Sequence, residues 1–181
     1  DWFPAAVPVP GGFVAVGDCI AMLDDEGVVV QAARLDVPMV SLAAHDGWLY
    51  AVDTLGKEIL MIHESGVIVA RIEPPLKGYL RAVASDGKML WAVTDAGEIL
   101  SSQNGFVWKT IDFNTKYAGF YPEMDFRAVA AGSGGVMFSL PSCSHCNNLE
   151  RYADDVLYSR VSTEDKVLLL GSDGCKLLEK P

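Results

Sequence analysis

The most compact set of reactive side chains is the segment Cys143-Ser-His-Cys146. Thiolates and imidazole are zinc ligands, but a closed zinc site needs four ligands in a tetrahedron, and His145 lies between the two cysteines, where the three cannot easily converge. A thiol-redox site would place the first cysteine at a helix N-terminus, and a short helix is predicted downstream, so this alternative stays open. We expect no metal and interpret Cys143 and Cys146 as a possible disulfide or two free thiols.

Aromatic side chains gather in two parts of the chain. They are Tyr79, Tyr117, Phe120, Tyr121 and Phe126. Three of them fall in the stretch 116–122, which also contains Gly and Pro, and rings exposed on such a loop can stack on sugars or grip a peptide. We expect Tyr117, Phe120 and Tyr121 to form a ligand-binding surface beside an insertion. The alternative is that these rings pack between sheets.

The remaining polar clusters define neither a catalytic nor a metal site. His45 and His63 are interpreted as satisfied or solvated structural histidines. The acidic runs at 24–26 and 154–155 lack the glycine and the alternating oxygen ligands of a calcium-binding loop, so solvated turns explain them. No Ser-His-Asp arrangement and no glycine-rich phosphate loop is indicated. The sequence therefore predicts no catalytic residue, no metal and no cofactor.

An internal repeat supplies the elements that position these residues. In three stretches an apolar run leads to a polar turn closed by glycine, and a second apolar run follows; the stretches are Ile20–Gln31, Leu60–Ala70 and Leu100–Lys109. The closing glycines are Gly27, Gly66 and Gly105, at steps of 66 − 27 = 39 and 105 − 66 = 39. Gly47 and Gly87 form a second series with a step of 87 − 47 = 40. A period near 40 residues with two hairpin turns per period is typical of a propeller.

The second and third repeats each contain four short runs rich in Val, Ile, Leu and aromatic residues, bounded by Gly, Asp or Ser. The runs are 40–44, 48–53, 58–63 and 67–72, then 81–84, 89–94, 99–102 and 107–112. Asp-Gly at 46–47 and 86–87 favours hairpins, because glycine adopts positive φ without a Cβ clash. The predicted fold class is all-β: a propeller-like array of about four antiparallel four-stranded blades.

The two ends of the array depart from the pattern. The segment 2–10 contains three prolines, so it is expected to be an edge strand or an extended arm. The fourth repeat carries an insertion at 141–164, where apolar residues spaced at i, i+3, i+4, i+7 and i+8 from Leu149 predict a short helix. The tail around Gly174 aligns either as the outer hairpin of the fourth blade or as the inner hairpin of a fifth. We predict a single propeller-like domain over 1–181, possibly a fragment of a larger propeller.

The turn of the third repeat resembles the Asp-box of sialidase-like, BNR-type propellers. Ser101, Gly105 and Trp108 stand at the motif's Ser, Gly and Trp positions, and Gln103 stands where the motif has Asp. In those families the box is a structural turn remote from any active site, so the resemblance implies a fold and no catalytic residue. A sialidase would also bring an arginine triad. The six arginines here offer too few candidates at inner-strand positions for that activity.

Composition limits the class of partner. Half of the 181 residues are hydrophobic and 21% are charged, which is typical of a folded domain. No apolar run reaches the roughly 18 to 20 residues of a membrane-spanning helix. A net charge of −10 and a pI near 4.6 argue against nucleic-acid binding. The four cysteines and the missing initiator Met indicate an extracytoplasmic or secreted protein, or a piece of a longer chain.

These observations favour a non-catalytic binding or scaffolding module that recognises a glycan or a protein through propeller loops. Two other classes stay open at the sequence level. One is a carbohydrate-active, sialidase-like propeller fragment, which would need a central arginine cluster or paired carboxylates. The other is a thiol-redox module, which depends on Cys143 and Cys146.

Overall fold

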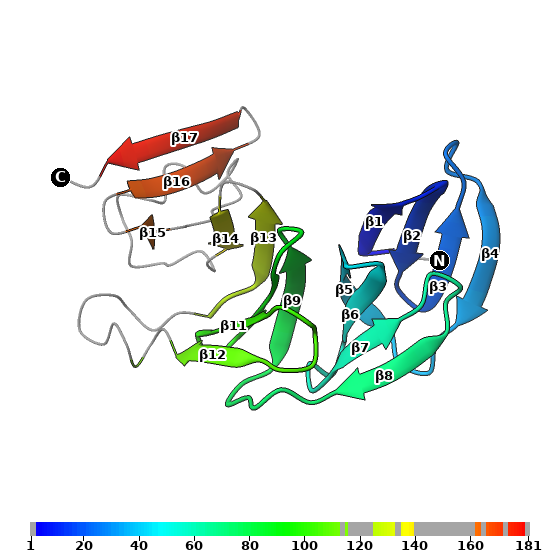
Figure 1. The fold of residues 1–181 in the computed structure, drawn as a ribbon, viewed down its shortest axis with the longest axis horizontal. Helices are drawn as coiled ribbons and strands as arrows, with labels where there is room; N and C mark the ends of the chain where they lie inside the picture. The colour runs from blue at the N-terminus through cyan, green and yellow to red at the C-terminus, as the bar shows by residue number, and fades with distance from the viewer. Residues whose placement is uncertain are drawn as a thin grey trace.

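The protein is a series of antiparallel β-sheets that follow one another in an arc, seen in Figure 1. The computed structural model describes residues 3–112, 115, 125–132, 135–139, 162–163, 166–171 and 174–179. Among these residues there are three four-stranded sheets, one two-stranded sheet and one three-stranded sheet. The all-β, propeller-like class predicted from the repeat is therefore confirmed. Each four-stranded sheet is one blade.

The first blade begins with the proline-containing segment. Its strands are β1 (Ala5–Val9), β2 (Gly12–Val16), β3 (Cys19–Leu23) and β4 (Val29–Arg34). Strand β1 pairs with β2 along its whole length and has no partner on its other side among the described strands. Proline has no N–H to donate, so Pro8 is tolerated in such an edge strand. The expectation of an edge strand is confirmed.

The second and third blades repeat this plan with the innermost strand first. The second contains β5 (Met39–His45), β6 (Trp48–Asp53), β7 (Ile59–Ile62) and β8 (Ile68–Ile72). The third contains β9 (Leu80–Ser85), β10 (Leu90–Thr94), β11 (Glu98–Ser102) and β12 (Lys109–Asp112). Within each blade, consecutive strands pair antiparallel. The register shifts at Met22/Leu23 and again 39 residues later at Met61/Ile62, so even the irregularity repeats.

The rest of the described chain forms two smaller sheets. One pairs β13 (Ala128–Gly132) with β14 (Gly135–Ser139), and the other contains β15 (Ser162–Thr163), β16 (Lys166–Gly171) and β17 (Gly174–Glu179). The tail around Gly174 is thus a hairpin in a sheet separate from β13 and β14. Of the predicted insertion at 141–164, only 162–163 is described, and its predicted helix lies outside the described residues.

The closing glycines occupy equivalent hairpin turns, as predicted. Gly27, Gly66 and Gly105 lie between the third and fourth strands of their blades with φ of 79°, 84° and 75°. Residues other than glycine rarely adopt such φ values. At Gly105 the space is also limited, because a Cβ built there would lie 2.3 Å from Cε1 of Tyr50 in the neighbouring blade.

One backbone hydrogen bond recurs between blades and fixes how each inner strand enters. Met39 N donates to Gly17 O at 2.9 Å, Leu80 N to Gly56 O at 2.8 Å, and Phe126 N to Thr94 O at 3.3 Å. In the first two bonds the first residue of an inner strand is tied to the turn between the second and third strands of the preceding blade. In the third bond Phe126, shortly before β13, is tied to the last residue of β10. The repeated bond therefore sets a common relation between consecutive sheets.

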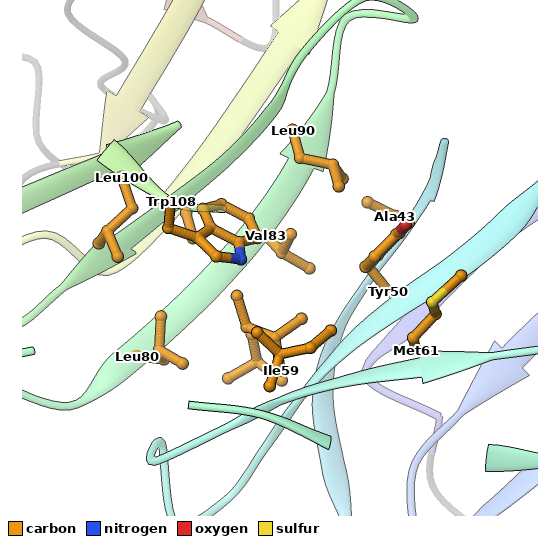
Figure 2. Packing of buried hydrophobic residues seen from close by; sticks show 12 residues of the cluster. Ala43, Tyr50, Ile59, Met61, Leu80, Val83, Leu90, Leu100 and Trp108 are labelled. Atoms are coloured by element: carbon orange, nitrogen blue, oxygen red, sulfur yellow. The ribbon is translucent and has the colours of Figure 1, made fainter. Parts of the chain in front are cut away.

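The core lies in the seams between neighbouring blades. The seam between the first and second blades includes Val14, Ile20 and Leu60, and the seam between the second and third includes Ile59 and Trp108. Figure 2 shows this second seam, where side chains of the two sheets interdigitate. Side chains alternate across a strand, so the adjacent residues Ile59 and Leu60, both fully buried, serve opposite seams.

The meander gives each blade two distinct ends. Connections between blades and turns between second and third strands share one end, which we call the connector face. Turns between first and second strands and between third and fourth strands share the other end, the hairpin face. No helix within the described residues has the length and apolar character needed to cross a membrane.

Candidate functional site

The predicted ligand-binding and cysteine residues fall outside the part of the chain that is described. These are Tyr117, Phe120, Tyr121, Cys143 and Cys146. Tyr79 and Phe126, the other two aromatic residues named in the sequence analysis, differ in burial. Phe126 is buried in a cluster with Ala82, Val93 and Ile99, so it belongs to the core. Tyr79 is 47% exposed on the connector face and is available to a ligand.

Tyr79 is held in a fixed position beside charged groups. Its backbone N–H donates to Asp95 Oδ1 at 2.8 Å, and its carbonyl accepts from the Asp95 N–H at 3.1 Å. The Lys57 ammonium lies 4.0 Å from the centre of its ring, a cation–π contact between neighbouring blades. The backbone is thus anchored while the ring faces solvent, which suits a preorganised contact residue.

Two arginines occupy equivalent places on this face. Arg81 is the second residue of β9, and Arg127 comes directly before β13. Arg81 Nη2 lies 2.5 Å from Asp95 Oδ2, and Arg127 pairs with Asp125. The sequence carried a signal for this pair that was missed, since Arg-Ala-Val-Ala occurs at 81–84 and again at 127–130.

The carboxyl group of Asp95 lies at the centre of this arrangement. Its partial burial acts to raise its pKa, but the Tyr79 N–H and the Arg81 guanidinium outweigh burial and hold the pKa below its usual value, with Arg127 adding a smaller contribution. Nearby, a hydrogen bond from Lys77 and further bonds from Thr115 lower the pKa of Asp112 to about 2. Both carboxylates are therefore charged at neutral pH.

Positive and negative groups on the connector face neutralise one another in pairs. The four ion pairs of the described residues all lie there: Arg71–Glu58, Lys77–Asp112, Arg81–Asp95 and Arg127–Asp125. Arg71, Arg81 and Arg127 each have a carboxylate partner, whereas Arg34, at the end of β4, has no ion pair among the described residues. The paired groups offer many hydrogen-bonding atoms with little local net charge, which suits an uncharged polar ligand better than a free anion.

The structure brings together a histidine and a serine that the sequence did not connect. His45, at the end of β5, is 5% exposed, with Nδ1 2.9 Å from Ser85 Oγ and Nε2 3.1 Å from Gln103 O. A carbonyl only accepts, so Nε2 carries a proton, and Nδ1 shares a hydrogen bond with the Ser85 hydroxyl. The ring is buried and lacks an orienting carboxylate, so this pair joins two blades and does not form a hydrolase site. The expected structural role of His45 is confirmed.

The other histidine in the described part of the chain is tied to its own turn. His63 Nδ1 accepts from the Ser65 N–H at 3.1 Å and lies 2.8 Å from its hydroxyl, while the ring meets Trp48 edge-on. Cys19 is a free, half-buried thiol in β3. Within the described residues, no group of His, Cys, Asp and Glu side chains is arranged to hold a metal ion.

Comparisons with known proteins identify solved structures of similar fold. No protein-family model matches the chain, and no curated protein matches it in sequence. Among solved structures, virginiamycin B lyase from Staphylococcus aureus, with quinupristin, matches with a TM-score of 0.62 and 17% identity. That match covers 98% of this chain and 54% of the lyase.

Two further solved structures match the chain over nearly its whole length. The WD40 domain of Neurospora crassa Pan2 has a TM-score of 0.61 and 11% identity, covering 96% of this chain and 50% of that one. BamB from Moraxella catarrhalis has a TM-score of 0.54 and 8% identity, covering 97% and 42%. All three are β-propellers, and at such identities the similarity establishes the fold alone. The chain spans about half the length of these proteins.

Proposed function

We propose that the protein is a non-catalytic binding module that recognises an uncharged polar ligand, a neutral glycan or a polypeptide segment, through its connector face. The observation that carries this proposal is the exposed Tyr79 ring, fixed by Asp95 and flanked by Lys57 and the paired arginines. An aromatic ring among balanced charges provides stacking area and directional hydrogen bonds together.

The proposed site extends to Tyr117, Phe120 and Tyr121. They belong to the connection that leaves β12 at Asp112 and enters β13 after Arg127, and both ends of that connection lie on the connector face. Loops held by a rigid sheet scaffold are where binding residues concentrate. The degenerate Asp-box at 101–108 is proposed to take no part in this site, since it lies on the opposite face.

The test is a screen followed by matched variants. The chain would be probed against an array of neutral and charged glycans and against a displayed random-peptide library, and affinities of retained ligands would be measured by calorimetry. We expect Tyr79→Ala or Tyr121→Ala to weaken binding about tenfold or more. The control is Phe106→Ala, which removes an exposed ring from the hairpin face and should leave affinity unchanged.

Two results would contradict the proposal. One is that retained ligands bind the Tyr79 and Tyr121 variants as tightly as the unaltered chain. The other is that neither screen yields a ligand at all. If the protein converted a bound glycan chemically, it would be a carbohydrate-active enzyme and not a non-catalytic module.

A further inference from the structure

A second surface of different chemistry lies on the hairpin face. The residue that follows each closing glycine is apolar and exposed: Val28, Val67 and Phe106, at steps of 39 residues, are 56%, 59% and 55% exposed. Val107, next to Phe106, is exposed as well. Single exposed apolar side chains are common, but a set repeated at one structural position on one face is typical of an interaction surface.

The turns that carry these side chains are held rigidly. In the first blade, Asp24 Oδ1 accepts from the N–H groups of Glu26 and Val28 at 3.0 and 2.8 Å. In the third blade, Asn104 Oδ1 accepts from the N–H groups of Phe106 and Val107, both at 3.0 Å. Such side-chain bonds fix a turn locally. A partner that docks here therefore orders little of the protein, which favours binding.

Each of the later turns is also hydrogen-bonded to the blade before it. Ser65 O, in the turn of the second blade, accepts from Gln31 Nε2 of β4 at 3.4 Å. In the third blade, Asn104 O accepts from the Tyr50 hydroxyl at 3.5 Å, and Gln103 O accepts from His45. The three apolar positions are thus parts of one rim and not isolated loop tips.

This rim carries an excess of negative charge. The hairpin turns and the first residue after them hold six carboxylates and two lysines, a balance of 2 − 6 = −4; they are Asp24, Asp25, Glu26, Asp46, Glu64, Asp86, Lys88 and Lys109. The four ion pairs of the described residues are all on the opposite face, so none of them offsets this charge. The two ends of the blades therefore differ in loop type and in whether their carboxylates are held in ion pairs.

We propose that the hairpin face is a docking surface for a basic polypeptide segment in which apolar side chains alternate with lysines or arginines. The repeated apolar positions supply contact area, and the unbalanced carboxylates select a positive partner and steer it electrostatically. The whole chain has a net charge of −10, which adds to that steering. This surface is independent of the proposed ligand site on the connector face.

The probe is a short fluorescein-labelled peptide of lysine and leucine, compared with a peptide in which glutamate replaces lysine. Anisotropy titrations would give the affinities. We expect the lysine peptide alone to bind, and to bind more weakly as salt is raised. Glu26→Gln/Glu64→Gln should weaken binding about fivefold or more. The matched control Asp36→Asn/Glu73→Gln makes the same charge change at exposed positions of the connector face and should weaken it less than about twofold.

Apolar contact is tested with Val67→Ser, matched by Leu55→Ser on the connector face, since the two side chains are about equally exposed. Only Val67→Ser should weaken binding, by about threefold or more. Equal effects of the two charge variants would mean attraction by overall charge and would overturn the proposal. An unchanged affinity of the Val67→Ser variant would also overturn the proposal. Sedimentation showing a dimer that Phe106→Ser dissociates would overturn it in favour of a second copy of the chain.

Discussion

Single residues at equivalent positions of the repeat can have different costs of substitution. Gly27 and Gly105 both have positive φ, but a Cβ at Gly27 would meet nothing within 4 Å, whereas at Gly105 it would meet Tyr50 at 2.3 Å. Gly27→Ala should lower the free energy of unfolding by about 1 kcal/mol, the cost of the backbone alone. Gly105→Ala should lower it by about 3 kcal/mol, because the ring must move. Urea unfolding of both variants measures the difference.

Gly66→Ala provides an intermediate point in that comparison, since its Cβ would lie 3.3 Å from Ile20 Cγ2. The expected order of cost is Gly27, Gly66, Gly105. Equal costs at the three positions would show that the contact between Gly105 and Tyr50 carries no energy.

A charged residue of the connector face gives a prediction for pH. Folding lowers the pKa of Asp95 from its ordinary 3.8, so its carboxylate stabilises the fold above that pH, and the contribution is lost as pH falls through the lowered pKa. Asp95→Asn should cost about 1 kcal/mol at pH 7, a value kept small because Arg81 is partly exposed. Denaturant unfolding at pH 7 and below pH 3.8 should show the gap between variant and unaltered chain closing. A gap independent of pH would contradict the assignment.

Sequence reasoning recovered single residues unevenly. Gly27, Gly66 and Gly105 were located because a turn with positive φ leaves a visible glycine at a fixed period. The bridge from His45 to Ser85 was missed, although 85 − 45 = 40, because a hydrogen bond between blades depends on how two sheets are placed and has no local pattern. Arg81 and Arg127 could have been found by aligning the repeated Arg-Ala-Val-Ala, but Asp95, the partner of Arg81, lies in a turn that only folding brings close.

At the scale of elements, one buried side chain fixes the connection between the second and third blades. Glu98, in β11, is 2% exposed, and its Oε2 accepts from the N–H groups of Lys77 and Gly78 and from the Thr94 hydroxyl, at 3.0 to 3.1 Å. Glu98→Ala would leave these donors without an acceptor in a buried place. We expect the free energy of unfolding to fall by about 2 to 4 kcal/mol, measured by thermal and denaturant melts.

The matched control for that prediction is Glu58→Ala. Glu58 stands 40 residues earlier in the repeat but pairs with the exposed Arg71 at the surface. Its loss should cost less than about 1 kcal/mol. Similar costs for the two variants would mean that Glu98 does not organise the connection.

Strands were more predictable than the way they assemble into sheets. The run 48–53 is β6 and the run 89–94 contains all of β10, because alternation and turn residues are local signals. The extent of the array was not predictable in the same way. Whether the tail extends the sheet of β13 or forms its own depends on pairing between distant segments, and the sequence supports both. In the structure β16 lies between β15 and β17 and pairs with both.

At the scale of the whole molecule, stability should vary along the arc. The second blade has a packed seam on each side, whereas the first blade has one seam among the described residues, and every residue of its outer strand β4 is exposed. In an array, a unit's stability is roughly its own plus that of its interfaces. Amide hydrogens of β2 and β3 should therefore exchange faster than those of β6 and β7 in native-state exchange experiments.

Two adjacent residues of β7 test whether the seams act separately. Leu60→Ala removes packing from the seam with the first blade, and Ile59→Ala removes packing from the seam with the third; both side chains are fully buried. Each should cost about 2 to 5 kcal/mol. If stability is transmitted through seams, Leu60→Ala should accelerate exchange in β2 and β3 more than Ile59→Ala, and Ile59→Ala should act more strongly on β9 and β10. Identical exchange patterns would instead mean that the described blades unfold as one cooperative unit.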